Sequence, residues 1–325
     1  MAVFTTLTDQ EAAGLLSEFD IGEFRALEPI AGGIENTNYF LDTTQGRWVL
    51  TVFERLSAEQ LPFYLKLTAH LKAAGLPVAA PVRTREGSLF STVKGKPFAV
   101  ANRLSGASVV EVTPAECADM GRVLARMHLA AADFPLHQDN LRGPQWWKEV
   151  VPQLLPHLGE SERAMLEEEL AHQLALFADP DFQALPQAAC HCDLFRNNAM
   201  IEGHGTAKAR VCGVFDFYFA GCTPLVYDIA VTVNDWCTAF DDPELSLEAE
   251  KTGAFLTGYE SVRPLWTQEK AVLSDMLRAG ALRFWISRLF DVYMPREATL
   301  LKPHDPTYFE KILRSRRSCA LPFSL

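Results

Sequence analysis

The chain has 325 residues, 48% of them hydrophobic and 22% charged, which suits a globular protein with a substantial core. Its formal net charge of −11 argues against a nucleic-acid partner, because phosphate backbones attract basic surfaces. The sequence has no apolar run of about 18 residues, no leader pattern and no C-x-x-C pair, so we expect a cytoplasmic protein with reduced thiols and no membrane contact.

Residues 1–104 predict a small lobe rich in strands. The expected elements are a helix beginning at Thr8, strands at residues 28–30, 38–41 and 48–53, a hairpin turn at Gln45-Gly46, a helix capped by Ser57 and ending at Ala74, and further short strands up to residue 104. A boundary near Ser105-Gly106 follows, because the pattern beyond it becomes helical.

Residues 105–325 predict a larger, mainly helical lobe. Its expected helices begin with one at Thr113-Pro114 and continue within residues 145–156, 161–178, 225–238, 244–260, 267–294 and 306–316. Two strand-and-loop motifs interrupt them before the helix expected within 225–238. We therefore predict an α+β, protein-kinase-like fold of two lobes.

The interrupting motifs are residues 190–198 and 214–217. In them Asp193, Asn198 and Asp216 each follow a strand-like stretch. Phosphoryl transfer from ATP needs an aspartate to accept the proton of the acceptor hydroxyl, and an Asn and an Asp to hold metal ions. The spacing predicts Asp193 as the catalytic base, and Asn198 and Asp216 as ligands of Mg²⁺, which prefers oxygen donors.

Each motif has a simpler interpretation. An aspartate after a strand is often only a turn or helix cap. The two thiols of Cys190-His191-Cys192 look like metal ligands, but on a strand they point opposite to His191, and two thiols without a second pair make a poor zinc site. We interpret both cysteines as small buried residues, and the order of the two motifs as favouring phosphotransfer.

Residues 31–39 lie between two predicted strands of the first lobe and contain Gly32 and Gly33. Glycines let backbone N–H groups approach phosphate oxygens, although a Gly-Gly pair alone also fits a simple hairpin turn. Kinase-type folds usually carry a phosphate-binding lysine on the third strand. Here Thr51 occupies the expected position, and Arg103 and Arg196 are the candidate replacement cations, unless they are surface or ion-pair residues.

The chain resembles the aminoglycoside phosphotransferase and choline kinase superfamily, and within it is similar to the homoserine kinases of that type. The motifs that carry the resemblance lie at residues 32–39, 49–51, 191–198, 216–218, 227–230, 234–237 and 283–289. A threonine at the lysine position is typical of that branch. Two departures are Cys192, where the superfamily often has Gly, and Asn197, where Asp is expected.

The resemblance implies roles residue by residue. It makes Asp193 the base and Asn198 and Asp216 the metal ligands, with His191 bracing the catalytic loop and Asp228 hydrogen-bonding that loop from the next helix. Residues 1–104 would bind the nucleotide, through Gly32, Gly33, Asn36, Asn38, Thr51 and Arg103, with the adenine against residues 98–104.

An amino-acid acceptor needs an anion for its ammonium group and a cation for its carboxylate. Asp235 and Arg283 are the candidates, with Tyr218 and Trp236 bordering the acceptor. The alternatives stay open: Asp235 could be a solvated helix-end carboxylate, Trp236 a core residue, and Arg283 or Arg288 the partner of an internal carboxylate.

The expected function is ATP-dependent phosphorylation of L-homoserine to O-phospho-L-homoserine, a step of threonine biosynthesis. The alternatives are a choline, ethanolamine or other small-alcohol kinase of the same superfamily, and a nucleotide-binding pseudokinase. A quaternary-ammonium acceptor would need an aromatic cage and no arginine. The sequence carries no signal for the oligomeric state.

Overall fold

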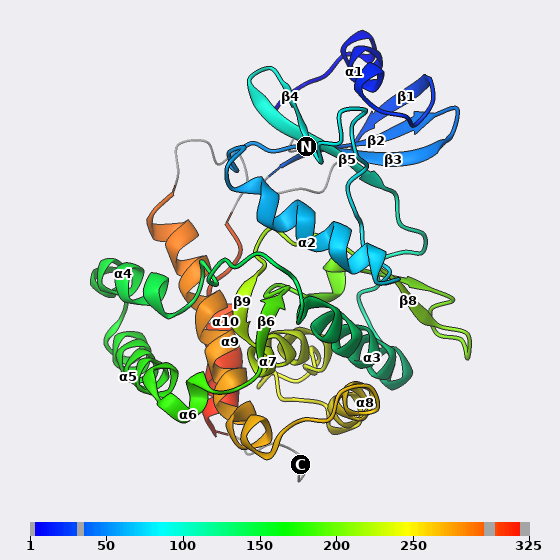
Figure 1. Ribbon diagram of the computed structural model, residues 1–325. Helices are drawn as coiled ribbons and strands as arrows, with labels where there is room; N and C mark the ends of the chain where they lie inside the picture. The colour runs from blue at the N-terminus through cyan, green and yellow to red at the C-terminus, as the bar shows by residue number, and fades with distance from the viewer. Residues whose placement is uncertain (1–3, 31–35, 296–302, 319–325) are drawn as a thin grey trace. The chain divides into compact units, whose positions relative to one another are not determined.

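The computed structural model describes residues 4–30, 36–295 and 303–318 (Figure 1). Its chain divides into two compact units, Met1–Ser105 and Gly106–Leu325. Gly32 and Gly33 lie outside the described residues. In the part of the chain that is described, no helix is both long and apolar enough to cross a bilayer.

The first unit is built on an antiparallel sheet whose five described strands run in the order β1-β2-β3-β5-β4. Its elements are α1 (Asp9–Leu15), the 3₁₀ turn η1 (Leu16–Glu18), β1 (Phe24–Pro29), β2 (Thr37–Thr43), β3 (Gly46–Val52), α2 (Leu61–Ala73), β4 (Ser91–Val93) and β5 (Lys96–Asn102). Thr43 pairs with Gly46 in the register of β2 and β3, which confirms the predicted hairpin.

The two faces of this sheet differ in polarity. Leu50 and Val52 of β3 lie on the face that packs with Leu16 and Phe19 into a buried apolar core. Because side chains alternate along a strand, Thr51 lies on the opposite face, where its cross-strand partner is Asn38. The opposite face therefore carries the polar residues that were predicted to meet a nucleotide.

Local capping explains where the helices begin. Thr8 and Thr113 both form capping boxes, with Glu11 and Glu116 respectively, as their spacing predicts. The helix expected from Ser57 instead begins at Leu61. Pro62 gives the reason, because proline lacks an N–H and is tolerated only in the first turn of a helix. A start at Ser57 would have put Pro62 in the helix interior.

The second unit is mainly helical, with short strand pairs β6–β9 and β7–β8. Its elements are α3 (Pro114–Ala131), α4 (Pro144–Leu154), the 3₁₀ turn η2 (Leu155–His157), α5 (Glu160–Ala178), α6 (Pro180–Gln183), β6 (Gln187–Cys190), the 3₁₀ turn η3 (Arg196–Asn198), β7 (Ala199–Glu202), β8 (Arg210–Val214), β9 (Gly221–Pro224), α7 (Leu225–Trp236), α8 (Ala249–Glu260), α9 (Thr267–Tyr293) and α10 (Thr307–Ser318). The mixture of sheet and helix confirms the predicted α+β class.

Helices α3 and α8 cross at backbone contact, side by side in Figure 1. A Cβ atom added to Gly121 of α3 would lie 2.1 Å from the carbonyl oxygen of Phe255, and one added to Gly258 would lie 2.0 Å from that of Ala118. Both distances are impossible for real side chains, so only glycines allow this approach. The crossing brings Tyr259 of α8 against α3.

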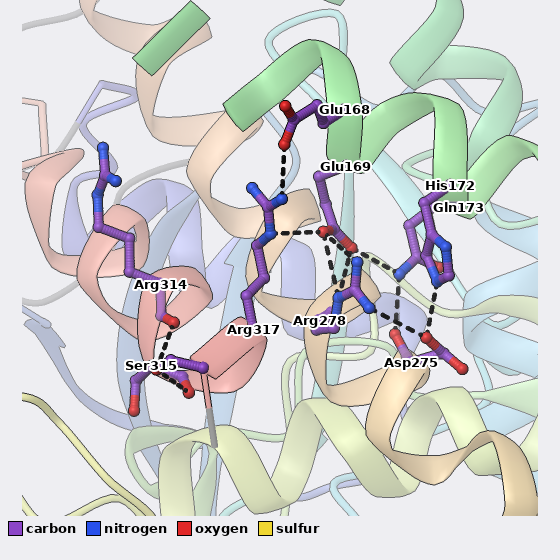
Figure 2. A network of polar contacts seen from close by, with 10 residues as sticks. Glu168, Glu169, His172, Gln173, Asp275, Arg278, Arg314, Ser315 and Arg317 are labelled. Atoms are coloured by element: carbon purple, nitrogen blue, oxygen red, sulfur yellow. Dashed lines mark hydrogen bonds and ion pairs between the residues drawn. The ribbon is translucent and has the colours of Figure 1, made fainter. Parts of the chain in front are cut away.

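A buried carboxylate joins α5, α9 and α10 (Figure 2). Glu169 of α5 is fully buried and accepts hydrogen bonds from Arg278 Nε of α9 at 3.0 Å and from Gln173 Nε2 at 2.8 Å. Arg317 Nε of α10 lies 3.5 Å from its Oε2 atom. Since a buried charge is tolerated only with such partners, this network fixes α9 against two neighbouring helices.

We predict that Glu169→Gln lowers the free energy of unfolding by about 3 kcal/mol, because it leaves the partly buried guanidinium of Arg278 without its buried carboxylate. Glu168→Gln is the matched control: Glu168 pairs with the same Arg317, but its side chain is 67% exposed, so its loss should cost less than about 1 kcal/mol. Urea denaturation of both variants measures the difference. Equal losses would contradict a structural role for the buried network.

Candidate active site

The loop after β6 folds back on Asp193. Asn198 Nδ2 donates to the Asp193 carbonyl oxygen at 2.8 Å and to its Oδ2 atom at 3.3 Å. The backbone N–H of Phe195 donates to the same carbonyl at 2.8 Å. The five-residue spacing seen in the sequence therefore brings the two side chains together and holds the Asp193 carboxylate in place.

Two candidate metal ligands lie on adjoining segments. Because Asn198 Nδ2 is taken up by Asp193, its Oδ1 atom is the one left to accept or to ligate. Asp216 follows β8, is exposed and has a positive φ of 63°, which aspartate tolerates better than most residues. The N–H of Phe215 donates to the Asn198 carbonyl at 3.1 Å and so joins the two segments. An amide and a carboxylate oxygen form a donor set that fits a hard divalent cation.

His191 braces the loop in one defined tautomer. Its Nε2 lies 2.9 Å from the Phe215 carbonyl oxygen, which can only accept, and its Nδ1 accepts the Asp193 N–H at 3.3 Å. The proton therefore resides on Nε2. The ring also packs against Phe217 at 4.4 Å between centroids. Burial lowers the pKa of His191, which keeps the imidazole neutral as both bonds require.

Asp228, in the first turn of α7, holds the start of the same loop. Its Oδ2 accepts the N–H of His191 at 3.0 Å and its Oδ1 accepts the N–H of Cys192 at 2.8 Å. Cys192 has a φ of +62°, a left-handed conformation that is costly for a residue with a Cβ. Burial alone would raise the pKa of Asp228, but the hydrogen bonds and charges of its partners outweigh it and hold that pKa below its usual range.

Arg283 of α9 approaches the candidate base directly. Its Nη1 lies 3.8 Å from Asp193 Oδ1, and its side chain is only 4% exposed. The guanidinium stacks 3.8 Å above Phe284 and 4.9 Å above Phe219. Its Nε and Nη2 atoms are buried without a hydrogen-bond partner. Nε and Nη2 are thus the unsatisfied donors of this guanidinium, and Nη1 is the nitrogen that lies beside Asp193.

Asp235 and Trp236, which were expected at the acceptor, both form hydrogen bonds to the loop after β6. Asp235 Oδ2 accepts both the N–H and the Nε–H of Arg196, at 2.7 and 3.0 Å. This ion pair also removes Arg196 from the candidates for the missing cation. Trp236 is a core residue that is 1% exposed, and its buried indole N–H is satisfied by the Leu194 carbonyl at 3.1 Å. Tyr218 lies partly exposed two residues after Asp216.

In the first unit, three expected nucleotide residues lie on one face of the sheet. Thr51 Oγ1 donates to Asn38 Oδ1 at 2.7 Å. Arg103 follows β5 and stacks 4.0 Å above Phe40, which occupies the same face of β2 as Asn38. Asn36 precedes β2 and is partly buried. Arg103 therefore offers a cation on the face that carries Thr51.

The sequence did not point to three residues around the loop. Phe219 stacks on Arg283, while His128 of α3 and Tyr259 of α8 connect to Asp228. The one sequence signal for Phe219 is its position three residues after Asp216. His128 and Tyr259 are 131 residues apart, so no local pattern could pair them.

Comparison with known proteins gives the class of the protein. Residues 26–265 match a family model described as the phosphotransferase enzyme family. The chain therefore belongs to this family and is a kinase. Among solved structures, it is similar to amicoumacin kinase hAmiN in complex with AMP-PNP, Ca²⁺ and Ami, with a TM-score of 0.71 and 16% identity over 98% of this chain and 96% of that one. The spectinomycin phosphotransferase APH(9)-Ia, in complex with ADP and spectinomycin, gives a TM-score of 0.70 and 14% identity over 97% and 99%. These neighbours confirm the predicted kinase-like fold.

Relatives with higher sequence identity to this chain are homoserine kinases. The homoserine kinase of Cupriavidus necator is 51% identical over 320 residues, covering 97% of this chain and 96% of that protein. The homoserine kinase of Burkholderia thailandensis is 49% identical over 322 residues, again covering 97% and 96%. The predicted resemblance to the homoserine kinases of this superfamily is thereby confirmed.

We predict that acid destabilises the protein through His191. Because its folded pKa is lowered below the unfolded value of about 6.5, the unfolded chain takes up the proton first as the pH falls. Stability from this group is thus present above pH 6.5 and lost below it. The free energy of unfolding of the wild type, measured relative to that of His191→Gln, should fall by up to about 1.4 kcal/mol per pH unit between pH 6.5 and 5.5. Parallel curves for the two proteins would rule this out.

Proposed function

We propose that the chain phosphorylates the side-chain hydroxyl of L-homoserine with ATP, giving O-phospho-L-homoserine. The homoserine kinases that match nearly the whole chain support the acceptor. The observation that carries the chemistry is the loop that holds Asp193 between the amide of Asn198 and the guanidinium of Arg283. The product would serve threonine biosynthesis, in the cytoplasm and without a nucleic-acid partner.

Asp193 is the proposed catalytic base. Its carboxylate accepts the proton of the acceptor hydroxyl while the hydroxyl oxygen forms a bond to the γ-phosphorus and the bond to the β-phosphate oxygen breaks, releasing ADP. Because the transition state resembles metaphosphate, the enzyme mainly positions the two oxygens and balances charge. The hydrogen bond from Asn198 Nδ2 supports this role by fixing the carboxylate's direction.

Asn198 Oδ1 and Asp216 would hold the divalent cation, for which we propose Mg²⁺. When bound, the cation neutralises charge on the phosphate oxygens. His191 supports both ligand segments, since it bonds the Phe215 carbonyl and the Asp193 N–H. In the first unit we propose that Gly32, Gly33, Asn36, Asn38 and Thr51 line the nucleotide, with Arg103 as the cation in place of the usual lysine.

Arg283 is the proposed partner of the homoserine carboxylate. A buried cation beside the base suits an anionic group on the acceptor and opposes a quaternary ammonium group, which disfavours choline. Nη1 would make the contact, because it is the guanidinium nitrogen next to Asp193. Tyr218 and Asp235 stay the proposed neighbours of the acceptor, Asp235 with part of its charge balanced by Arg196.

We predict that Asp193→Asn lowers kcat for homoserine phosphorylation by roughly 1,000-fold, because the amide cannot accept the hydroxyl proton. Asp181→Asn, an exposed aspartate in α6 of the same unit, should leave kcat unchanged. A coupled assay of ADP release with ATP and homoserine measures both. Equal rates for wild type and Asp193→Asn would end the proposal that Asp193 is the base, and no homoserine-dependent rate in wild type would end the proposed acceptor.

We predict that Arg283→Lys raises KM for homoserine roughly 30-fold with little change in KM for ATP, since a lysine does not reproduce the guanidinium contact. Arg288→Lys is the matched control on α9. Its guanidinium donates to the Asp305 carbonyl and stacks on Tyr308, so its KM for homoserine should change less than twofold. The reverse result would put the carboxylate site at Arg288, and thermal melting checks that both variants fold.

A further inference from the structure

A buried cluster behind the catalytic loop has no assigned role. His128, Cys190 and Asp228 are all buried, with possible ligand atoms within 4.8 Å of one another. Both nitrogens of His128 are already hydrogen-bonded, Nε2 to Asp228 Oδ2 at 3.0 Å and Nδ1 to the Tyr259 hydroxyl at 2.8 Å. Burial raises the pKa of the Cys190 thiol and keeps it protonated, which does not suit a metal ligand. The cluster is better explained as part of a hydrogen-bond chain.

This row of hydrogen bonds continues from Tyr259 of α8 through Arg263 to Glu269 in the first turn of α9. Arg263 Nη1 donates to the Tyr259 hydroxyl at 3.2 Å, and its Nη2 donates to Glu269 Oε2 at 3.0 Å. Glu269 is fully buried and also accepts the N–H of Trp266 at 2.9 Å. A continuous row of buried polar groups thus runs from Glu269 to Asp228.

The two ends of the row fix the direction of every bond in it. Arg263 can only donate, so the Tyr259 oxygen accepts from it and its single O–H must donate to His128 Nδ1. The proton of His128 then resides on Nε2, which donates to Asp228, a carboxylate that can only accept. Burial raises the pKa of Tyr259 and keeps that hydroxyl protonated. The row has one consistent arrangement of protons.

At its inner end the row meets the strained part of the loop. Asp228 accepts a third hydrogen bond, from His128, besides those from the N–H groups of His191 and Cys192. The His128 bond fixes the rotation of the carboxylate, and the carboxylate holds Cys192 at a φ of +62° directly before Asp193. A carboxylate free to rotate would hold one N–H or the other less well.

We propose that His128 and Tyr259 are positioning residues, whose donor row orients Asp228 and thereby sets the direction of Asp193 for phosphoryl transfer. The inference rests on the proposed role of Asp193 as the base. It goes beyond packing, because the hydroxyl of Tyr259 contributes through its hydrogen bonds and hardly through its volume. The close approach of α3 and α8 at Gly121 and Gly258 accompanies this bond between Tyr259 and His128.

Four variants test the proposal. Tyr259→Phe keeps the ring and removes the hydroxyl, so His128 Nδ1 loses its donor and the imidazole is held less firmly in the orientation that directs Nε2–H at Asp228. We expect kcat to fall roughly tenfold, with KM for ATP and homoserine within twofold. His128→Leu should lower kcat roughly 100-fold, whereas His128→Gln, whose amide can still donate to Asp228, should recover most of the loss. Thr252→Val, which removes another buried hydroxyl from α8, is the control and should leave kcat unchanged.

Two measurements separate positioning from stability. Thermal melting reports folding, and ¹⁵N NMR of His128 reports which ring nitrogen carries the proton, independently of any acceptor. We expect Nε2–H in all three proteins, with the ¹⁵N shift of a hydrogen-bonded Nδ1 in wild type and in Thr252→Val and that of an Nδ1 without a donor in Tyr259→Phe. If Tyr259→Phe and His128→Leu keep kcat within twofold while melting earlier, the row only packs, and the proposal fails. A wild type with the expected tautomer but no turnover of homoserine would instead refute the proposed acceptor.

Discussion

The Asp228 carboxylate is the group on which the active-site loop depends. It is fully buried and accepts three hydrogen bonds, two of them from consecutive backbone N–H groups of His191 and Cys192. Those bonds offset the cost of removing a charge from water and hold a left-handed residue that would otherwise relax. Since Asp193 comes directly after that residue, the direction of the proposed catalytic side chain follows from a carboxylate 35 residues further along the chain.

The second unit contains several buried charges, and two of those on or against α9 have different kinds of partner. Glu169 is met by arginines from two helices, which fixes α9 in the helical layer. Arg283, on that same helix, is met by aromatic faces and by Asp193. A charge held by rings keeps more of its capacity to bind a further anion than one held by carboxylates. Helix α9 thus combines an end that is fixed by Glu169 with a guanidinium that lies beside Asp193, the proposed base.

Sequence reasoning succeeded where the relevant interactions are local. The Asp193 and Asn198 spacing and the capping boxes of Thr8 and Thr113 all join residues within five positions. It left alternatives open where tertiary packing decides. Trp236 lies in the core and Arg196 pairs with Asp235, and the sequence alone did not choose between these roles and roles in the site. The partners His128 and Tyr259 come from different helices, so their bond depends on a crossing that no periodicity reveals.

The glycine contact between α3 and α8 has a consequence for how this sequence can change. Because the two backbones touch at Gly121 and Gly258, α8 cannot slide along α3, and the register between the two helices is fixed. One residue inserted ahead of Gly258 would turn the following helix by about 100°. Tyr259 would then face away from His128 however well the remaining surfaces repacked. Length variation in this part of the chain is therefore confined to the loops that precede α8 and follow it.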